Sequence, residues 1–210
     1  MIEMTIVVEG LAEDAAGTGH LAEDIERATY RALNLAATKT RTKLDKLVRS
    51  QVAFPAAYLR PSTGNLTVAE KARKGKLDVV IQGRDHPTSL ARFATYKGDT
   101  GRPAGKDGLD VIVKPGAAKF VKGAFIIKLR NGNRGFAIRT PGGPPSGAYK
   151  PRRINEKLWL LYGPSVDQVL YGTRAVRDGA FGDVEAEAGT IFEDEFWRQL
   201  DLVEGGAANG

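Results

Sequence analysis

The side chains that most often carry enzyme chemistry are few in this sequence, and they lie far apart. Cysteine is absent, which excludes disulfides, zinc–thiolate sites and thiol nucleophiles. The two histidines, His20 and His86, have no partner at metal-ligand spacing, so we expect both on the surface. The sequence also lacks a G-x-S-x-G motif and therefore gives no support to a serine hydrolase.

Acidic and glycine-rich stretches do not predict a cofactor site either. Asp183, Glu185 and Glu187 alternate, but they lack the glycine and the terminal glutamate of a calcium-binding EF-hand loop. They are typical of acids near a helix N-terminus, where the helix dipole favours negative charge. The segments GNRG and TPGG match neither the dinucleotide-binding pattern nor the P-loop. We therefore predict that the protein is not an enzyme, with no catalytic residue, no metal site and no cofactor.

The basic side chains are distributed very unevenly along the chain. Residues 1–27 carry seven acids and one arginine, residues 28–157 carry 27 bases and eight acids, and residues 158–210 carry ten acids and three bases. The net charge of +6 therefore hides a strongly basic body between two acidic ends. Three interpretations stay open: a surface that faces nucleic acid, acidic ends that dock on neighbouring copies, or a solvated surface.

Two basic segments are candidates for contact with DNA or with a neighbouring subunit. The first is the second half of a helix predicted over 20–51, whose alternative role is a core helix with a solvated outer face. The second is the Gly- and Pro-rich loop 140–153, which is long for a segment without regular structure. The candidate residues are Lys39, Arg41, Lys43, Lys46, Arg49, Lys150, Arg152 and Arg153.

Helices are predicted toward both ends of the chain. Apolar residues recur every three or four positions over 20–51, with no Gly or Pro inside, and Phe54-Pro55 follows the end. A second helix over 184–203 has a wide apolar face that includes Phe192, Phe196 and Trp197. We therefore expect the two helices to bury apolar faces against the rest of the protein.

Strands are predicted between these helices. The expected strands cover 77–81, 90–96 with Phe93 as a core residue, 109–113, 125–130, 135–139 and 158–162. The sequence FIIKLR places Phe125, Ile127 and Leu129 on one face and Ile126, Lys128 and Arg130 on the other, and Asn131-Gly132 is a strong hairpin signal. Residues 158–162 are almost continuously apolar, which is typical of a strand covered on both sides.

A short helix is predicted immediately after the last strand. Gly163-Pro164 ends that strand, and Ser165 is followed three residues later by Gln168. This spacing is a capping-box pattern, in which each side chain satisfies a free backbone N–H group of the other residue. We therefore expect a helix over 165–176.

The order and spacing of these segments resemble the phage minor tail protein Z family of tail-completion proteins. The resemblance rests on GAFI-x-K leading through the Asn-Gly turn to FAIRT, and on the strand that closes in L-x-GPSV. The helical segment ALNLAATKTRTKL, the segment ARFAT and the acidic, aromatic C-terminal helix are similar as well, so the resemblance spans residues 28–202. It implies a structural protein of the virion, at the head-proximal end of a long phage tail.

The expected fold class is α+β. A long N-terminal helix should pack on a mostly antiparallel β-sheet or partly open barrel, with C-terminal helices following. Residues 1–19 are expected to form an arm and linker, residues 20–203 a single domain, and residues 204–210 a flexible tail. The acidic start MIEMTIVVEG does not predict a signal peptide, and no apolar run reaches the roughly 18 residues of a membrane span.

The family resemblance implies partners and a location. The protein would assemble in the host cytoplasm into a homo-oligomeric ring, expected to be a hexamer, in the neck of the virion. Its partners would be a tail terminator or tail tube protein, head–tail connector proteins and genomic DNA in the channel. The expected subunit-interface residues are the apolar Phe192, Phe196 and Trp197 and the acidic Asp183 and Glu185.

Two alternatives stay open at this point. A tail terminator or head-closure subunit would occupy the same neck and is not separated from tail completion by sequence. A sequence-independent nucleic-acid-binding module, which needs no ring, belongs to a different class and is suggested by the basic body.

Overall fold

Helices and short antiparallel strands make up the chain, which is described here from a computed structural model covering residues 3–7, 22–147, 151–172 and 182–207. The strands are β1 (Glu3–Val7), β2 (Leu66–Glu70), β3 (Asp78–Gly83), β4 (Thr88–Ser89), β5 (Gly108–Lys114), β6 (Ala117–Lys122), β7 (Ala124–Lys128), β8 (Arg134–Arg139), β9 (Arg152–Asn155), β10 (Leu158–Leu160) and β11 (Tyr162–Gly163). The helices are α2 (Ala22–Gln51), α3 (Val166–Tyr171) and α4 (Gly182–Ala207), with the 3-10 helices η1 (Ala56–Leu59), η2 (Pro61–Thr63) and η3 (Leu90–Arg92).

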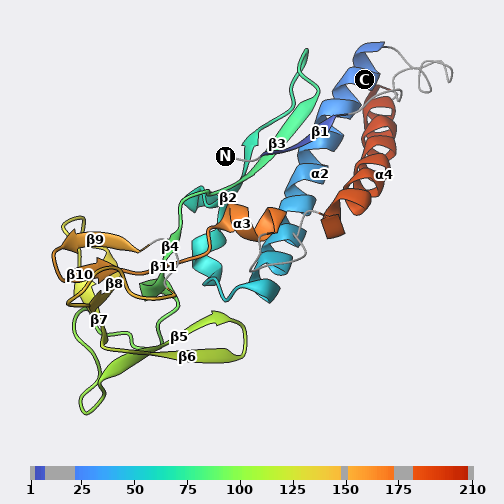
Figure 1. The fold of residues 1–210 in the computed structure, drawn as a ribbon. Helices are drawn as coiled ribbons and strands as arrows, with labels where there is room; N and C mark the ends of the chain where they lie inside the picture. The colour runs from blue at the N-terminus through green and yellow to red at the C-terminus, as the bar shows by residue number, and fades with distance from the viewer. Residues whose placement is uncertain (1–2, 8–21, 148–150, 173–181, 208–210) are drawn as a thin grey trace.

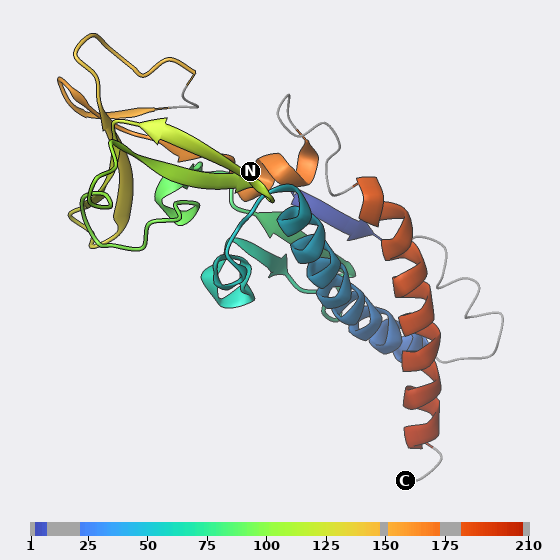
Figure 2. The same cartoon turned by 90° about the horizontal axis from the view of Figure 1, so that it is seen from below.

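One part of the molecule, which we call the helical part, consists of the three α-helices, η1, η2 and the sheet β1-β3-β2 (Figure 1). Helix α2 packs against β2 and β3, and α4 lies along α2 (Figures 1 and 2). The two helices are antiparallel, because Lys39 pairs with Glu195 whereas Lys43 pairs with the earlier Glu187. The apolar stripe of α2 is buried as its spacing predicts, with Leu33, for example, fully enclosed.

The second part, which we call the β part, lies at the other end of the molecule (Figure 1). It contains the hairpin β5-β6 and a four-stranded antiparallel sheet of order β7-β8-β10-β9. The small ladder β4-β11 lies between the two parts (Figure 1). A continuous hydrophobic cluster includes residues of both parts, such as Leu33 of α2 and Phe136 of β8. The fold class is therefore α+β, with open antiparallel sheets and no closed barrel in the described residues.

Two local sequence signals are confirmed, the turn at Asn131-Gly132 and the capping box at Ser165. Gly132 adopts a φ of 77° in the turn between β7 and β8, a conformation that glycine tolerates without steric cost. The Ser165 hydroxyl accepts a hydrogen bond from the Gln168 N–H at 3.1 Å, and the Gln168 side chain accepts one from the Ser165 N–H at 3.0 Å. The capping box therefore starts α3, although the helix ends at Tyr171, five residues earlier than predicted.

Several predicted strands differ in the structure. The predicted strand 90–96 is wrong: η3 begins at Leu90, and only Phe93 keeps its expected place in the core, at 5% exposure. The predicted loop 140–153 ends earlier, because Arg152 already belongs to β9. Trp159 is half-buried, so β10 is not covered on both faces. Pairing with β10 sets the start of β9, and local propensity does not report such an interaction.

The buried side of β7 is the opposite of the one that the alternation suggests. Ala124 and Ile126 point into the core, at 0% and 1% exposure, whereas Phe125 and Ile127 are half-buried. The Phe125 ring instead lies under the Arg139 guanidinium, 4.7 Å from the ring centroid. Because both faces of β7 carry apolar residues, the alternation of side chains alone does not show which face is buried.

The ends of the chain depart partly from the predicted organisation. Residues 3–7 of the expected arm form β1, which pairs with β3 from Glu3 opposite Gln82 to Val7 opposite Asp78. The rest of the predicted linker, residues 8–19, lies outside the described residues. The tail expected from residue 204 is wrong for residues 204–207, which belong to α4, and residues 208–210 lie outside the described residues.

Candidate functional site

A groove of about 640 Å³ lies where the helical part meets the β part. Its basic lining residues are four arginines, Arg84, Arg92, Arg134 and Arg152, which we call the groove arginines, together with Lys97; Asp99 is the acid in the lining. The other lining residues are Pro55, Tyr58, Pro87, Ser89, Ala91, Leu129, Asn131, Gly132, Asn133, Leu160 and Tyr162. The lining has five positive charges and one negative charge, so the groove is suited to an anionic ligand.

Tyr58 positions two of the groove arginines. It belongs to η1, which starts after Pro55, and it is 4% exposed. The Arg92 guanidinium lies over its ring, 4.5 Å from the centroid, in a cation–π contact. Arg84 donates a hydrogen bond from Nη1 to the Tyr58 hydroxyl at 3.2 Å. The hydroxyl also lies 3.3 Å from Oγ1 of Thr88. A buried tyrosine thus fixes the directions of two cations that are themselves exposed.

The β part supplies the other two groove arginines. Arg134 begins β8, directly after the β7-β8 turn, and donates from Nη2 to the Tyr96 carbonyl at 2.7 Å. Its Nε atom is buried and has no hydrogen-bond partner among the described residues. Arg152 begins β9, the outer strand of the four-stranded sheet, and is exposed. Both guanidinium groups therefore keep N–H donors that no acceptor in the described part of the chain uses.

The predicted basic face of α2 is largely engaged by the same chain. Lys39 pairs with Glu195 of α4, and Lys43 pairs with Glu187. Lys46 is exposed, and no ion pair to it occurs among the described residues. The acidic C-terminal helix thus covers part of the basic helix within one chain, and its docking on the body of a neighbouring copy stays a prediction.

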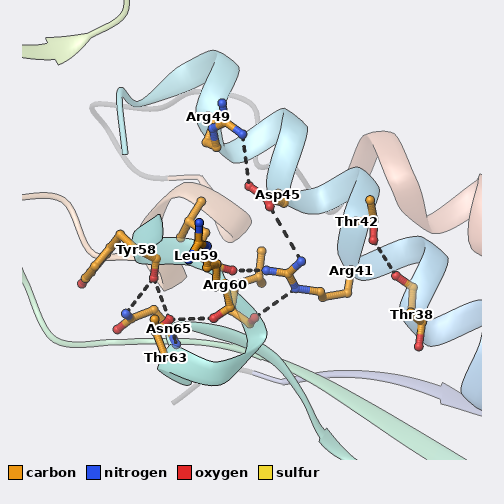
Figure 3. Close-up of polar contacts among 11 residues, drawn as sticks. Thr38, Arg41, Thr42, Asp45, Arg49, Tyr58, Leu59, Arg60, Thr63 and Asn65 are labelled. Atoms are coloured by element: carbon orange, nitrogen blue, oxygen red, sulfur yellow. Dashed lines mark hydrogen bonds and ion pairs between the residues drawn. The ribbon is translucent and has the colours of Figure 1, made fainter. Parts of the chain in front are cut away.

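Arg41 is buried, which corrects its prediction as a residue facing DNA or a neighbour (Figure 3). It donates from Nε to the Leu66 carbonyl at 3.1 Å and from Nη2 to the Leu59 carbonyl, and its Nη1 lies 3.7 Å from Asp45. Burial lowers the pKa of the Arg41 guanidinium, and the Asp45 carboxylate opposes that shift. On the outer side, Arg49 lies 4.0 Å from Asp45. Arg41 therefore holds the segment from η1 to β2 against α2.

The structure describes two of the three candidate basic residues of the loop 140–153. Arg152 lines the groove, and Arg153 is exposed with its guanidinium 6.0 Å from the centroid of the Trp159 ring. Lys150 lies outside the described residues. Among the predicted basic residues that the structure describes, Arg152 is the one that lines the groove.

Two of the three predicted interface residues whose side chains the structure describes lie in the interior of the chain. Phe192 and Phe196 are 4% and 0% exposed, so they are core residues and not free for contact between subunits. Trp197 is 42% exposed and remains accessible. Asp183 and Glu185 belong to α4, but their side chains lie outside the described residues.

Sequence reasoning did not identify Tyr58 or the groove arginines other than Arg152. Arg134 lies within GNRG, a segment that matches no nucleotide-binding pattern. Arg84 lies between the predicted strands 77–81 and 90–96, and Arg92 lies within the second of them, with no spacing that links the two arginines. The one signal in the sequence is the excess of basic over acidic residues in 28–157, which does not say where the bases meet.

The described residues show few other sites for chemistry. No group of three His, Cys, Asp or Glu side chains lies close enough to hold a metal in this part of the chain. His86 is exposed, with Nδ1 2.5 Å from Asp85, and this hydrogen bond lowers the pKa of the Asp85 carboxyl. His20 lies outside the described residues. None of the helices that the structure describes has the length and apolarity of a membrane span.

Comparisons of the chain with protein families, with curated proteins and with solved structures found no match. The case for function therefore rests on the residues and on their arrangement.

The pair of Lys39 and Glu195 predicts a specific pH dependence of stability. Glu195 is 4% exposed, and its carboxylate accepts hydrogen bonds from Lys39 and from Arg198, the latter at 2.6 and 2.9 Å. The Lys39 hydrogen bond lowers the pKa of Glu195 below its ordinary value of 4.5, against the opposing effect of burial. The unfolded carboxyl therefore binds its proton at higher pH than the folded one, so the stabilisation is complete above 4.5 and is lost as pH falls.

Replacing Glu195 with glutamine tests this dependence. We expect the variant to lose about 2 kcal/mol of unfolding free energy at neutral pH, the contribution of hydrogen bonds to a charged group. The difference from the wild type should shrink toward zero as the pH is lowered well below 4.5. Urea denaturation of both proteins across this range provides the measurement, and a difference that stays constant with pH would contradict the assignment.

Proposed function

We propose that this chain is a structural subunit of a phage virion, a tail-completion protein that forms a ring at the head-proximal end of the tail and joins the tail to the DNA-filled head. The observation that carries the proposal is the order and spacing of the segments that resemble the minor tail protein Z family. GAFI-x-K and FAIRT correspond to the paired strands β7 and β8, and L-x-GPSV leads through β11 into the capping box of α3. The Leu161 N–H donates a hydrogen bond to the Phe136 carbonyl at 2.9 Å, which links the start of the last segment to β8.

Contacts between subunits of the proposed ring would use residues that remain exposed. On α4, the large exposed apolar side chains are Trp197, at 42%, and Leu202, at 57%. Tryptophan is enriched among residues that dominate binding energy at interfaces, because it buries a large area with little loss of conformational freedom. Of the three predicted apolar anchors, Phe192, Phe196 and Trp197, only Trp197 therefore keeps the expected role.

Electron cryomicroscopy of purified tails mixed with the protein tests this function. We expect a ring at the head-proximal end of the tail, and we expect Trp197→Ala to weaken its occupancy while the protein stays folded. A phage lacking the protein should make tails of normal length that fail to produce infectious particles. Abnormally long tails would favour the tail-terminator alternative, and no binding to tails or heads would contradict a role in the neck.

The second candidate function is sequence-independent binding of nucleic acid. The specific observation that favours it is the groove, where basic side chains from both parts of the molecule meet without matching acids. This function does not require a ring and can be tested on the isolated protein.

A further inference from the structure

We propose that the groove binds a single strand of nucleic acid through its phosphates, with the groove arginines as the contact residues. This inference deepens the second candidate function, on which it rests, because it names the contact residues and selects a single strand over a duplex. It rests on the charge balance of the groove, on the way its arginines are held, and on its size.

The charge balance of the groove differs from that of the rest of the basic surface. On α2, Lys39 and Lys43 are neutralised by acids of α4. Within the described residues, no carboxylate forms an ion pair with any groove arginine, and Asp99 is the one acid in the lining. Like charges that gather without counter-charges repel one another in the free protein. An anionic ligand removes this repulsion, so the groove favours such a ligand by charge alone.

Three of the four groove arginines are held in place before any ligand arrives. The Tyr58 ring supports Arg92, the Tyr58 hydroxyl accepts a hydrogen bond from Arg84, and the Tyr96 carbonyl accepts one from Arg134. Each guanidinium has five N–H donors in a planar fork, and these contacts occupy only a few of them. The remaining donors match the oxygens of a phosphate, and the entropy lost on binding is reduced because the side chains are already ordered.

The size and lining of the groove favour a single strand over a duplex. A volume of about 640 Å³ accommodates a few nucleotides, whereas a double helix would touch only the rim. The lining also includes Asn131, Asn133 and the half-buried Tyr162, which offer polar contacts and a partly exposed ring. A charged groove with planar side chains is the usual form of a single-strand site, since bases stack on rings and on guanidinium planes.

A nucleic acid also fits this groove better than an acidic peptide does. A single strand carries a charge on every nucleotide, so consecutive phosphates can reach several guanidinium groups at once. A peptide would need a run of acidic residues to do the same. Because phosphate contacts carry no base information, we expect binding that is independent of sequence.

The test uses the full-length protein and a fluorescein-labelled oligodeoxythymidylate about 16 nucleotides long, the upper end of a single-strand site. Fluorescence anisotropy gives the dissociation constant at a series of salt concentrations. With four phosphate contacts, the logarithm of the association constant should fall with the logarithm of salt with a slope of about −3. The same titration is run with a duplex of equal length and with polyglutamate.

The diagnostic variant combines Arg84→Gln, Arg92→Gln and Arg152→Gln. All three side chains are exposed, so the substitutions should leave the fold intact, and circular dichroism and urea denaturation check this. We expect the affinity to fall at least about tenfold and the salt slope to become shallower by about 2, because three phosphate contacts are lost.

The matched control combines Lys46→Gln, Lys114→Gln and Lys119→Gln. These lysines are exposed on α2 and on the β5-β6 hairpin, none of them lines the groove, and their loss changes the net charge by the same amount. We expect the control to weaken binding less than about threefold, through the general field of the protein alone.

The outcomes distinguish the groove from other binding surfaces and nucleic acid from other ligands. Equal losses in the two variants would overturn the groove as the site, and tighter binding of duplex would overturn the choice of a single strand. Polyglutamate binding with the same affinity and the same dependence on the groove arginines would overturn nucleic acid as the ligand class. A failure here would leave the expected ring on tails intact, so the two proposals fail independently.

Discussion

Replacing Phe196 with alanine is expected to lower the free energy of unfolding by about 3–5 kcal/mol, the usual cost of removing a fully buried aromatic side chain. Phe196 is 0% exposed and contacts the rings of Phe192 and Trp197, with centroid distances of 6.1 and 5.3 Å. Its removal leaves a cavity between α4 and the rest of the core, which neighbouring side chains fill only in part. Urea denaturation followed by circular dichroism measures the change.

A truncation on the exposed side of the same helix provides the control. Leu202 is 57% exposed, so Leu202→Ala should cost less than about 1 kcal/mol. If Phe196 instead served contact between subunits, its replacement would leave the isolated chain as stable as the wild type and would change assembly alone. In that case the urea midpoint of the wild-type protein would depend on protein concentration, because dissociation is coupled to unfolding in an oligomer.

Replacing Arg41 with methionine is expected to lower the free energy of unfolding by about 3–5 kcal/mol. This loss is expected although methionine is also a long, unbranched side chain and fills much of the same space. The loss leaves the carbonyls of Leu59 and Leu66 without their charged donor and the Asp45 carboxylate without its inner partner. The loss of the charged donor from these buried carbonyls carries most of the penalty, and Asp45 keeps only its outer partner Arg49. Because arginine stays protonated at all ordinary pH values, the loss should be the same at pH values near 6 and near 8.

Arg49 offers the matched control for this substitution. It lies on the same helix and faces the same Asp45, but at 4.0 Å and with a side chain that is 44% exposed. Arg49→Met should change stability by less than about 1 kcal/mol, as is typical of surface ion pairs. If Arg41→Met were equally mild, the buried network of Figure 3 would not stabilise the fold.

The two substitutions together address how the helical part is held together. Phe196 represents apolar packing between α4 and the core, and Arg41 represents the polar attachment of the η1–β2 segment to α2. Sequence patterns alone predicted contacts outside the chain for both residues. Because both side chains are buried, they stabilise the fold of the single chain and are not available for contact with DNA or with another subunit.

Local signals in the sequence were sufficient for several elements of the fold. Helix α2 follows from apolar residues at helical spacing without interruption, and the structure begins it within two residues of the predicted start. The Asn131-Gly132 turn and the capping box of Ser165 and Gln168 were also predicted correctly. These features depend on interactions among residues close in sequence, where the backbone conformation is set by nearby side chains.

The buried face of each strand and the partners of each charge could not be obtained in this way. The alternation around Ile126 fits either face, and tertiary packing selects the one that meets the core. Lys39 and Arg41 look alike as basic residues on one helix, yet one pairs with Glu195 across 156 positions and the other is buried. Such differences depend on which segments are brought together by the fold.

The sequence by itself determined the α+β class, the long first helix and a basic body between acidic ends. The tertiary structure alone decided which of those basic residues gather in one groove and which pair with acids of the same chain. Tyr58, Arg84, Arg134 and Arg152 come from separate elements and share no spacing, so no periodic pattern links them. The physical reason is that a groove is a product of long-range packing, whereas sequence patterns report the conformation and burial of neighbouring residues.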